Sequence, residues 1–99
     1  MGLPITIEHE RISEFCRRHQ IRRLSFFGSV LRDDFGPESD VDVLVEFEAG
    51  ASIGYLGMAR MEQELGTLLG RRIDLRTPNE LSRHFRGRVL AEAREEYVA

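Results

Sequence analysis

The chain has 99 residues, of which 41% are hydrophobic and 31% are charged, so we expect one soluble domain spanning residues 1–99. The net charge of −3 differs from the strongly basic character of most non-specific nucleic-acid-binding domains, and we expect no direct nucleic-acid binding. The single cysteine, Cys16, excludes an intramolecular disulfide, and the sequence shows neither a membrane-spanning run nor a signal peptide, which together favour the cytoplasm.

Two elements are predicted before residue 30. Residues 6–20 are expected to form a helix capped by Thr6, because apolar or aromatic side chains recur at the spacing of one buried helix face. That face consists of Ile12, Phe15, Cys16 and His19. His19 lies near the C-terminal end of this helix, where a positive charge is favourable, and we interpret it as such a charge rather than as a ligand. The aromatic-rich segment 22–28 ends at Gly28 and is typical of a strand.

The middle of the chain contains the most regular element. Residues 29–35 are predicted to form a short helix that Gly36 and Pro37 end. Residues 41–48 alternate strictly between apolar and polar side chains, which predicts a strand. One face of this strand carries Val41, Val43, Val45 and Phe47, and the other carries Asp40, Asp42, Leu44 and Glu46.

The second half of the chain predicts two helices and one strand. A helix over 52–69, ended by Gly70, is expected to bury Leu56, Met61, Leu65, Leu68 and Leu69. Residues 71–76 alternate again, with Ile73 and Leu75 opposite Arg72, Asp74 and Arg76. Pro78 is expected to open a helical turn, and a last helix is predicted over 86–99, with Val89, Leu90 and Ala93 on its apolar side.

The predicted order α-β-α-β-α-β-α indicates a small α/β domain with a mixed sheet. Each predicted strand has one strongly apolar face and one face that carries charge. We therefore expect helices on the apolar face and an open opposite face that carries Asp42 and Asp74. An open sheet face with carboxylates indicates a site rather than a core.

Acidic side chains are concentrated just before and within the strand 41–48. Asp40 and Asp42 are two positions apart and point to one side, and Asp74 has the parity to face the same way from a neighbouring strand. Three converging carboxylates suit Mg²⁺, and two such ions can stabilise the attacking and leaving oxygens of a phosphoryl displacement. The remaining acids are expected in a solvated loop: Asp33, Asp34 and Glu38.

Gly28 and Ser29 supply the phosphate-binding part of the predicted site, beside these acids. A glycine at a strand end lets the backbone approach a phosphate closely. The N–H groups that follow, with the Ser29 hydroxyl, are then placed to bind a triphosphate tail. Arg32 could reach the same phosphates, and Arg76 is either a phosphate contact or a surface charge.

Other motifs compete with a metal and phosphate site for these residues. By itself the pattern D-x-D is more typical of a surface turn. An EF-hand is excluded because Phe35 and Gly36 interrupt its ligand positions, and no stretch forms a P-loop. Ser29 as a nucleophile would need a histidine base that the sequence does not locate. The combination of Gly-Ser, ten residues, D-x-D and a third aspartate sets this segment apart from a turn.

Gly28-Ser29, residues 30–39 and Asp40-Val41-Asp42 resemble the GSx₁₀DxD signature of the polymerase-β-like nucleotidyltransferase superfamily. With so short a chain, the sequence is similar to the minimal nucleotidyltransferases that act as antitoxins of HEPN-domain toxins. The resemblance runs over about 21–81 and implies the polymerase-β-like core. It also implies that Gly28 and Ser29 hold nucleotide phosphates, that Asp40 and Asp42 bind Mg²⁺, and that Asp74 completes the metal site and helps activate the acceptor hydroxyl.

The same resemblance implies a function. The protein would transfer AMP from Mg²⁺·ATP to a tyrosine of a HEPN ribonuclease toxin, neutralise it, and form a hetero-oligomer with it. Two alternatives stay open: an antitoxin that acts by binding alone, and nucleotidyl transfer to a small molecule or RNA. Candidate docking surfaces are helix 52–69, with Tyr55, Leu56 and Met58, and the arginine-rich segment 83–88. Ordinary packing and solvation explain both segments as well.

Overall fold

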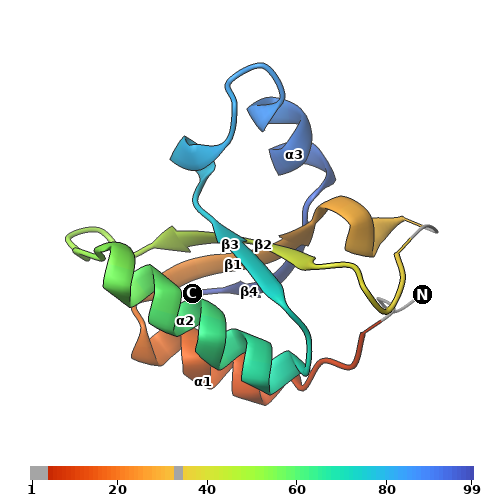
Figure 1. Ribbon diagram of the computed structural model, residues 1–99. Coiled ribbons are helices and arrows are strands. Elements are labelled where there is room, and N and C mark those ends of the chain that lie inside the picture. Colours follow the sequence, from red (N-terminus) through yellow and green to blue (C-terminus); the bar gives the residue numbers. More distant parts are fainter. Residues whose placement is uncertain (1–4, 33–34) are drawn as a thin grey trace.

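A four-stranded mixed sheet forms the centre of the protein, which we describe from a computed structural model over residues 5–32 and 35–99 (Figure 1). The strand order is β3-β2-β1-β4; β2 and β3 are parallel, and β1 is antiparallel to both of its neighbours. The elements in chain order are α1 (His9–Arg18), β1 (Ile21–Phe27), the 3₁₀ turn η1 (Gly28–Leu31), β2 (Val41–Phe47), α2 (Tyr55–Leu69), β3 (Ile73–Arg76), the 3₁₀ turn η2 (Pro78–Glu80), α3 (Arg86–Glu92) and β4 (Arg94–Val98).

The hydrophobic core lies between the sheet and the two longer helices. Helices α1 and α2 lie on the same side of the sheet (Figure 1). The predicted alternation of the strands is confirmed, since Val41, Val43 and Val45 are fully buried against these helices. The three valines belong to one cluster with Ile12, Phe15 and Cys16 from α1, Ile21, Leu24 and Phe26 from β1, Met61, Leu65 and Leu69 from α2, and Ile73 and Leu75 from β3.

The opposite face of the sheet is covered less. Helix α3 lies on this side (Figure 1) and has no buried residue. Ser25 and Leu44, which pair across β1 and β2, are buried on this face, whereas Asp42 and Asp74 farther along it are half-buried. The expected open face is thus present near the acidic residues. Within the described ranges, no helix combines the length and apolar composition that crossing a bilayer requires.

The C-terminal segment differs from the prediction of a helix over 86–99. The helix ends at Glu92, Ala93 adopts an extended ψ of 140°, and Arg94–Val98 pairs with β1 as an edge strand. Without this strand, the outer edge of β1 would leave its backbone N–H and C=O groups unpaired. The pairing therefore outweighs the helix propensity of the sequence around Ala93.

Side chains of β4 also join it to α1. The His9 Nδ1 lies 2.7 Å from Glu96 Oε2, and His9 Nε2 lies 3.2 Å from the Ser13 hydroxyl. Tyr97 packs against the core. The final strand is thus held both by backbone pairing and by a polar contact with the first helix.

The starts of both long helices also differ from the prediction. Helix α1 begins at His9 after Glu8 rather than at a Thr6 cap, and α2 begins at Tyr55 after Gly54 rather than at residue 52.

Leu56, predicted to be buried, is 76% exposed. It stands five residues before the buried Met61, so at about 100° per residue its side chain points away from the apolar stripe. The helix predicted over 29–35 is also shorter, because η1 ends at Leu31 and Arg32 is extended.

His19, by contrast, follows α1 as its C-cap, and its Nε2 lies 3.0 Å from Glu64 Oε1 of α2. It therefore joins the two long helices near the C-terminus of α1.

Two leucines of α2 test this packing. Leu65→Ala is expected to lower the free energy of unfolding by about 2–5 kcal/mol, because Leu65 is fully buried and its loss leaves a cavity. Leu56→Ala, the matched control on the same helix, is expected to change it by less than about 0.5 kcal/mol. Urea unfolding followed by circular dichroism measures both values. Similar losses for the two variants would contradict the assigned orientation of α2.

Candidate active site

Three segments far apart in the sequence meet where β1, β2 and β3 lie side by side. The parallel register of β2 and β3 places Asp42 directly opposite Asp74. On its other side Asp42 pairs with Phe27, the last residue of β1, and the chain then turns through Gly28 and Ser29. The sheet register alone therefore brings the Gly-Ser pair and two aspartates together.

Gly28 is in direct contact with the Asp42 carboxylate. Its φ is +74°, and a β-carbon at this position would lie 2.1 Å from Asp42 Oδ2. Any other residue would thus clash with the carboxylate and would also be strained in its backbone. With glycine here, the backbone N–H of Ser29 donates a hydrogen bond to Asp42.

The electrostatic environment of Asp42 is unfavourable for its negative charge. Burial raises the pKa of the Asp42 carboxyl, and the nearby charges of Asp74 and, to a smaller extent, Asp40 raise it further. The Ser29 N–H and Arg76 oppose this rise in part. A bound cation at this position would relieve the repulsion between the carboxylates.

Two arginines pair with the other two acids. Arg76 Nε donates to Asp74 Oδ1 at 3.0 Å, and this hydrogen bond, with the charge of Asp74, raises the pKa of Arg76. Arg72 Nε lies 3.0 Å from Asp40 Oδ1, and its Nη2 donates to the Glu38 carbonyl at 3.0 Å.

The three aspartates are therefore not equivalent. Asp42 and Asp74 are adjacent in the sheet, whereas Asp40 precedes β2 and its carboxylate is paired with Arg72. In the described part of the chain, no group of three or more His, Cys, Asp or Glu side chains is arranged to hold a metal ion. The donor set still fits a divalent cation, because carboxylates are hard oxygen ligands, and because burial and the neighbouring acids both disfavour the ionised form of Asp42 unless a cation is present.

The remaining predicted residues surround this cluster. The Ser29 hydroxyl donates to the Asp40 carbonyl at 3.5 Å, and the Arg32 N–H donates to the Ser29 carbonyl at 2.9 Å. The Arg32 side chain is exposed, beyond the end of η1, and Glu38 is exposed as expected for a solvated loop. Asp33 and Asp34 lie outside the described residues.

Sequence reasoning missed the roles of Arg71 and Arg72. Both contact the segment before Asp40 from across the sheet edge. The only signal in the sequence is a pair of arginines immediately before the strand that carries Asp74, and such a pair is also common on solvated surfaces. Their importance depends on β3 lying beside β2.

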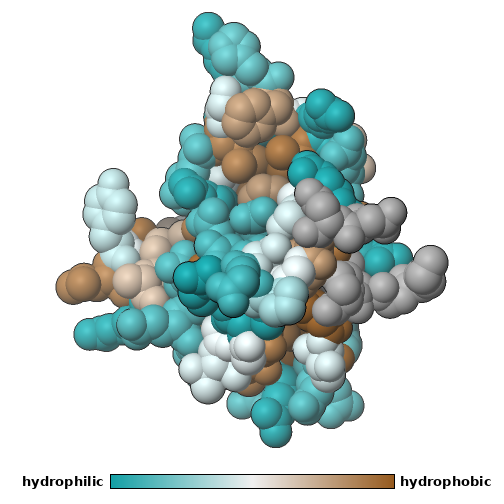
Figure 2. Space-filling model, turned by 45° about the vertical axis from the view of Figure 1, so that its right-hand side comes forward, coloured by the Kyte–Doolittle hydropathy of each residue, from teal (hydrophilic) through white to brown (hydrophobic). Residues whose placement is uncertain are grey.

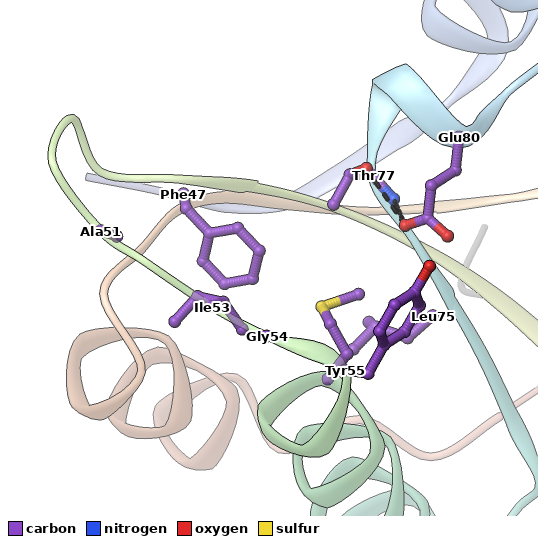
Figure 3. A pocket seen from close by; sticks show the side chains of 9 residues that line it. Phe47, Ala51, Ile53, Gly54, Tyr55, Leu75, Thr77 and Glu80 are labelled. Atoms are coloured by element: carbon purple, nitrogen blue, oxygen red, sulfur yellow. Dashed lines mark hydrogen bonds between the residues drawn. The ribbon is translucent and has the colours of Figure 1, made fainter.

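A cavity of about 440 Å³ lies at the other end of β2 and β3 (Figure 3). It is largely apolar, and Figure 3 shows the hydrogen-bonded Thr77 and Glu80 on one side of it. Its lining is Phe47, Ala51, Ile53, Gly54, Tyr55, Met58, Leu75, Thr77 and Glu80. None of the residues of the Gly-Ser and aspartate cluster contributes to it.

Comparison with known proteins places the chain among nucleotide-transferring enzymes. Residues 9–97 match the nucleotidyltransferase domain family. The Protein adenylyltransferase MntA of Thermococcus cleftensis is 37% identical over 79 residues, which cover 80% of this chain and 78% of that protein.

Solved structures agree with this match. One described as a "putative minimal nucleotidyltransferase" is 39% identical, has a TM-score of 0.70, and is matched over 86% of this chain and 85% of that chain. A complex of a tri-AMPylated Shewanella oneidensis HEPN toxin with an MNT antitoxin has the same fold, with a TM-score of 0.66 and 17% identity over 92% of this chain and 70% of that chain.

The raised pKa of Asp42 yields a pH-dependent prediction. Since the folded protein binds this proton more tightly than the unfolded chain, the wild type loses stability as the pH rises above the ordinary aspartate pKa of about 3.9. Asp42→Asn cannot ionise but can still accept the Ser29 hydrogen bond. We therefore expect this variant to be more stable than the wild type at pH 7 without divalent metal, and the gain to vanish as the pH falls below about 4.

Urea unfolding in EDTA at both pH values measures this difference. Glu14→Gln, at an exposed position of α1, serves as the control for removing one carboxylate and is expected to show no comparable gain. An Asp42→Asn variant that is less stable than the wild type at pH 7 would contradict the electrostatic assignment.

Proposed function

The chain belongs to the nucleotidyltransferase domain family, and from this membership we propose that it is a protein adenylyltransferase that moves AMP from ATP to a partner protein. The observation that carries this proposal is the junction of the Gly28-Ser29 turn with the Asp42–Asp74 pair. Nucleotidyl transfer needs a backbone that can bind phosphate next to carboxylates that can hold a cation.

The phosphate side of the site would be formed by the chain after β1. The Ser29 hydroxyl and the backbone of Gly28 and Ser29 are placed to contact the phosphates of ATP. Arg32 has an exposed side chain two residues beyond Val30 and would contact the same phosphates. Because arginine stays charged and presents a planar fork of donors, it suits a phosphate group.

The carboxylates would hold Mg²⁺, with two ions proposed, through Asp40, Asp42 and Asp74. Mg²⁺ takes oxygen ligands and, when bound, neutralises negative charge on a transferring phosphoryl group. Burial raises the pKa of Asp42, and the negative charges of Asp74 and Asp40 raise it further. Both effects support such an occupant, since a cation would favour the ionised carboxylates. Arg72 and Arg76 would then exchange their carboxylate partners for other groups.

The transfer itself is a displacement at the α-phosphorus of ATP. The acceptor hydroxyl oxygen forms a bond to this phosphorus while the bond to the oxygen that bridges to the β-phosphorus breaks, and diphosphate leaves. We assign Asp74 to accept the hydroxyl proton, because it lies beside Asp42 on the open face.

The proposed acceptor is a tyrosine of a HEPN-type ribonuclease toxin, which AMP would neutralise inside a hetero-oligomer in the cytoplasm. Two comparisons support this choice: the relative named as a protein adenylyltransferase, and the shared fold with a complex that contains an AMPylated HEPN toxin.

Exposed hydrophobic side chains also lie in both segments considered for docking. Tyr55 and Leu56 of the first segment are 96% and 76% exposed, and Phe85 of the segment 83–88 is 51% exposed. Leu90 of α3, just beyond that segment, is 44% exposed. Figure 2 shows hydrophobic atoms gathered toward the top of the molecule, on the side where α3 lies in Figure 1.

The first test of the proposal uses the protein together with its presumed toxin. With Mg²⁺ and ATP, the toxin is expected to gain mass in steps of one AMP, as measured by intact mass spectrometry. Asp42→Asn is expected to slow this gain by at least about 100-fold, because it weakens electrostatic stabilisation of the transferred group. Glu14→Gln, far from the cluster on α1, should transfer AMP at the wild-type rate.

Other outcomes would point to the alternatives. If the complex stays intact, the toxin is silenced and no mass is gained, the protein is an antitoxin that acts by binding. If labelled ATP modifies an aminoglycoside or RNA but not the toxin, the acceptor belongs to another class. Either result would overturn the proposed protein substrate.

A second test concerns the nucleotide site without any acceptor. Millimolar Mg²⁺·ATP is expected to raise the melting temperature, because a ligand that binds only the folded state stabilises it. The increase should be lost in Asp42→Asn. No shift in well-folded wild-type protein would argue against the proposed metal and nucleotide site.

A further inference from the structure

Arg71 binds the turn that leads into Asp40. Its Nη2 donates to the Gly36 carbonyl at 2.7 Å and to the Ser39 carbonyl at 2.9 Å. The carbon at the centre of its guanidinium lies 4.4 Å from the centroid of the Phe35 ring. One side chain therefore holds the turn at both ends and stacks on the residue before it.

The turn has few contacts of its own. The Ser39 N–H donates to the Gly36 carbonyl at 3.0 Å, and the Gly36 N–H donates to the Ser39 hydroxyl at 3.0 Å. These bonds close the turn but do not fix it to the rest of the protein. The contacts from Arg71 fix it to the segment before β3.

The backbone of Arg71 is itself held in place. Helix α2 ends at Leu69, its C-cap Gly70 has a φ of +65°, and the Arg71 N–H donates to the Gly66 carbonyl at 3.1 Å. On the other side, the Arg72 carbonyl accepts the Val41 N–H at 2.9 Å. Arg71 is thus anchored between the end of a long helix and the start of the parallel β2–β3 pairing.

Arg72 continues the same set of contacts toward the acidic cluster. It binds the Glu38 carbonyl and the Asp40 carboxylate, while Arg71 binds the carbonyls of Gly36 and Ser39. Together the two arginines contact every residue from Gly36 to Asp40 except Pro37 by a hydrogen bond or ion pair. Arg71 is half-buried and forms neither a hydrogen bond nor an ion pair with the described Asp40, Asp42 or Asp74, so its effect on them is indirect.

We propose that Arg71 is a positioning residue that sets the place of Asp40, and thereby its distance from Asp42, by fixing the turn 36–39. The inference rests on the proposed function, in which Asp40 holds a divalent cation. The guanidinium is needed for it, because lysine keeps the charge and can donate to carbonyls but has no planar group to stack on Phe35.

The test measures Mn²⁺ binding by electron paramagnetic resonance, without nucleotide, together with amide hydrogen exchange of residues 36–41. Arg71→Ala is expected to weaken Mn²⁺ binding by about 10-fold or more, as residues that support metal ligands commonly do. It should also speed exchange of the Ser39 and Val41 amides. Arg71→Lys should restore only part of the affinity, and Arg60→Ala, at an exposed position of α2, should bind Mn²⁺ as the wild type does.

A separate variant guards against a simple folding defect. Phe35→Leu removes the stacking partner but leaves both carbonyl contacts of Arg71, and it is expected to weaken Mn²⁺ binding less than Arg71→Ala. If Arg71→Ala does not fold, Arg71→Lys and Phe35→Leu carry the test.

The possible failures can be told apart. Wild-type Mn²⁺ affinity in folded Arg71→Ala, or in both substitute variants, overturns the positioning role while AMP transfer by the wild type remains. A wild-type protein that binds no Mn²⁺ and transfers no AMP overturns the proposed function and this inference with it.

Discussion

The parallel pairing of β2 with β3 places two carboxylates, those of Asp42 and Asp74, side by side on one sheet face. Like charges on adjacent side chains are costly unless other groups compensate them. Much of the surrounding polar structure provides this compensation. The Ser29 N–H donates to one carboxylate and Arg76 pairs with the other. Gly28 is required because no larger residue would leave room for the carboxylate it touches. The cost that remains at Asp42 is one that a bound cation, as proposed for this site, would offset.

The two faces of the sheet have different roles: one stabilises the fold, and the other carries the candidate site. The face covered by α1 and α2 carries the fully buried valines of β2 and supplies most of the apolar burial. The other face carries the aspartates and keeps them accessible, since α3 buries no residue against it. Because alternate residues of one strand serve the two faces, Val41 and Val43 stabilise the same strand that presents Asp42. Stability and the candidate chemistry are therefore close in sequence but separated in space.

Local patterns predicted the parts of the fold that depend on local physics. The alternation in residues 41–48 predicted β2, its two faces and the parity of Asp42, and the Gly-Ser pair indicated where β1 ends. Pairing between distant segments could not be predicted from local patterns. Residues 94–98 were predicted as part of a helix, because only their pairing with the outer edge of β1 makes a strand favourable there. Leu56 was wrongly predicted to be buried because it is apolar, although its spacing of five residues from Met61 places it off the apolar stripe of α2. The contacts of Arg71 and Arg72 depend on the adjacency of β2 and β3, which no single segment encodes.

The position of β4 has a consequence for how the protein opens. Phe26 of β1 pairs with Arg94 across an interval that contains β2 and β3, so forming this contact requires closing a long loop of chain. An edge strand with mostly exposed side chains belongs to the less protected parts of a structure, so we expect β4 to open in local unfolding more readily than the buried β1–β2 pairing. Its departure would release Glu96 from His9 and free that end of α1. The β1–β2–β3 sheet would keep its pairing, so the edge can fray while Asp42, Asp74 and Gly28 stay together.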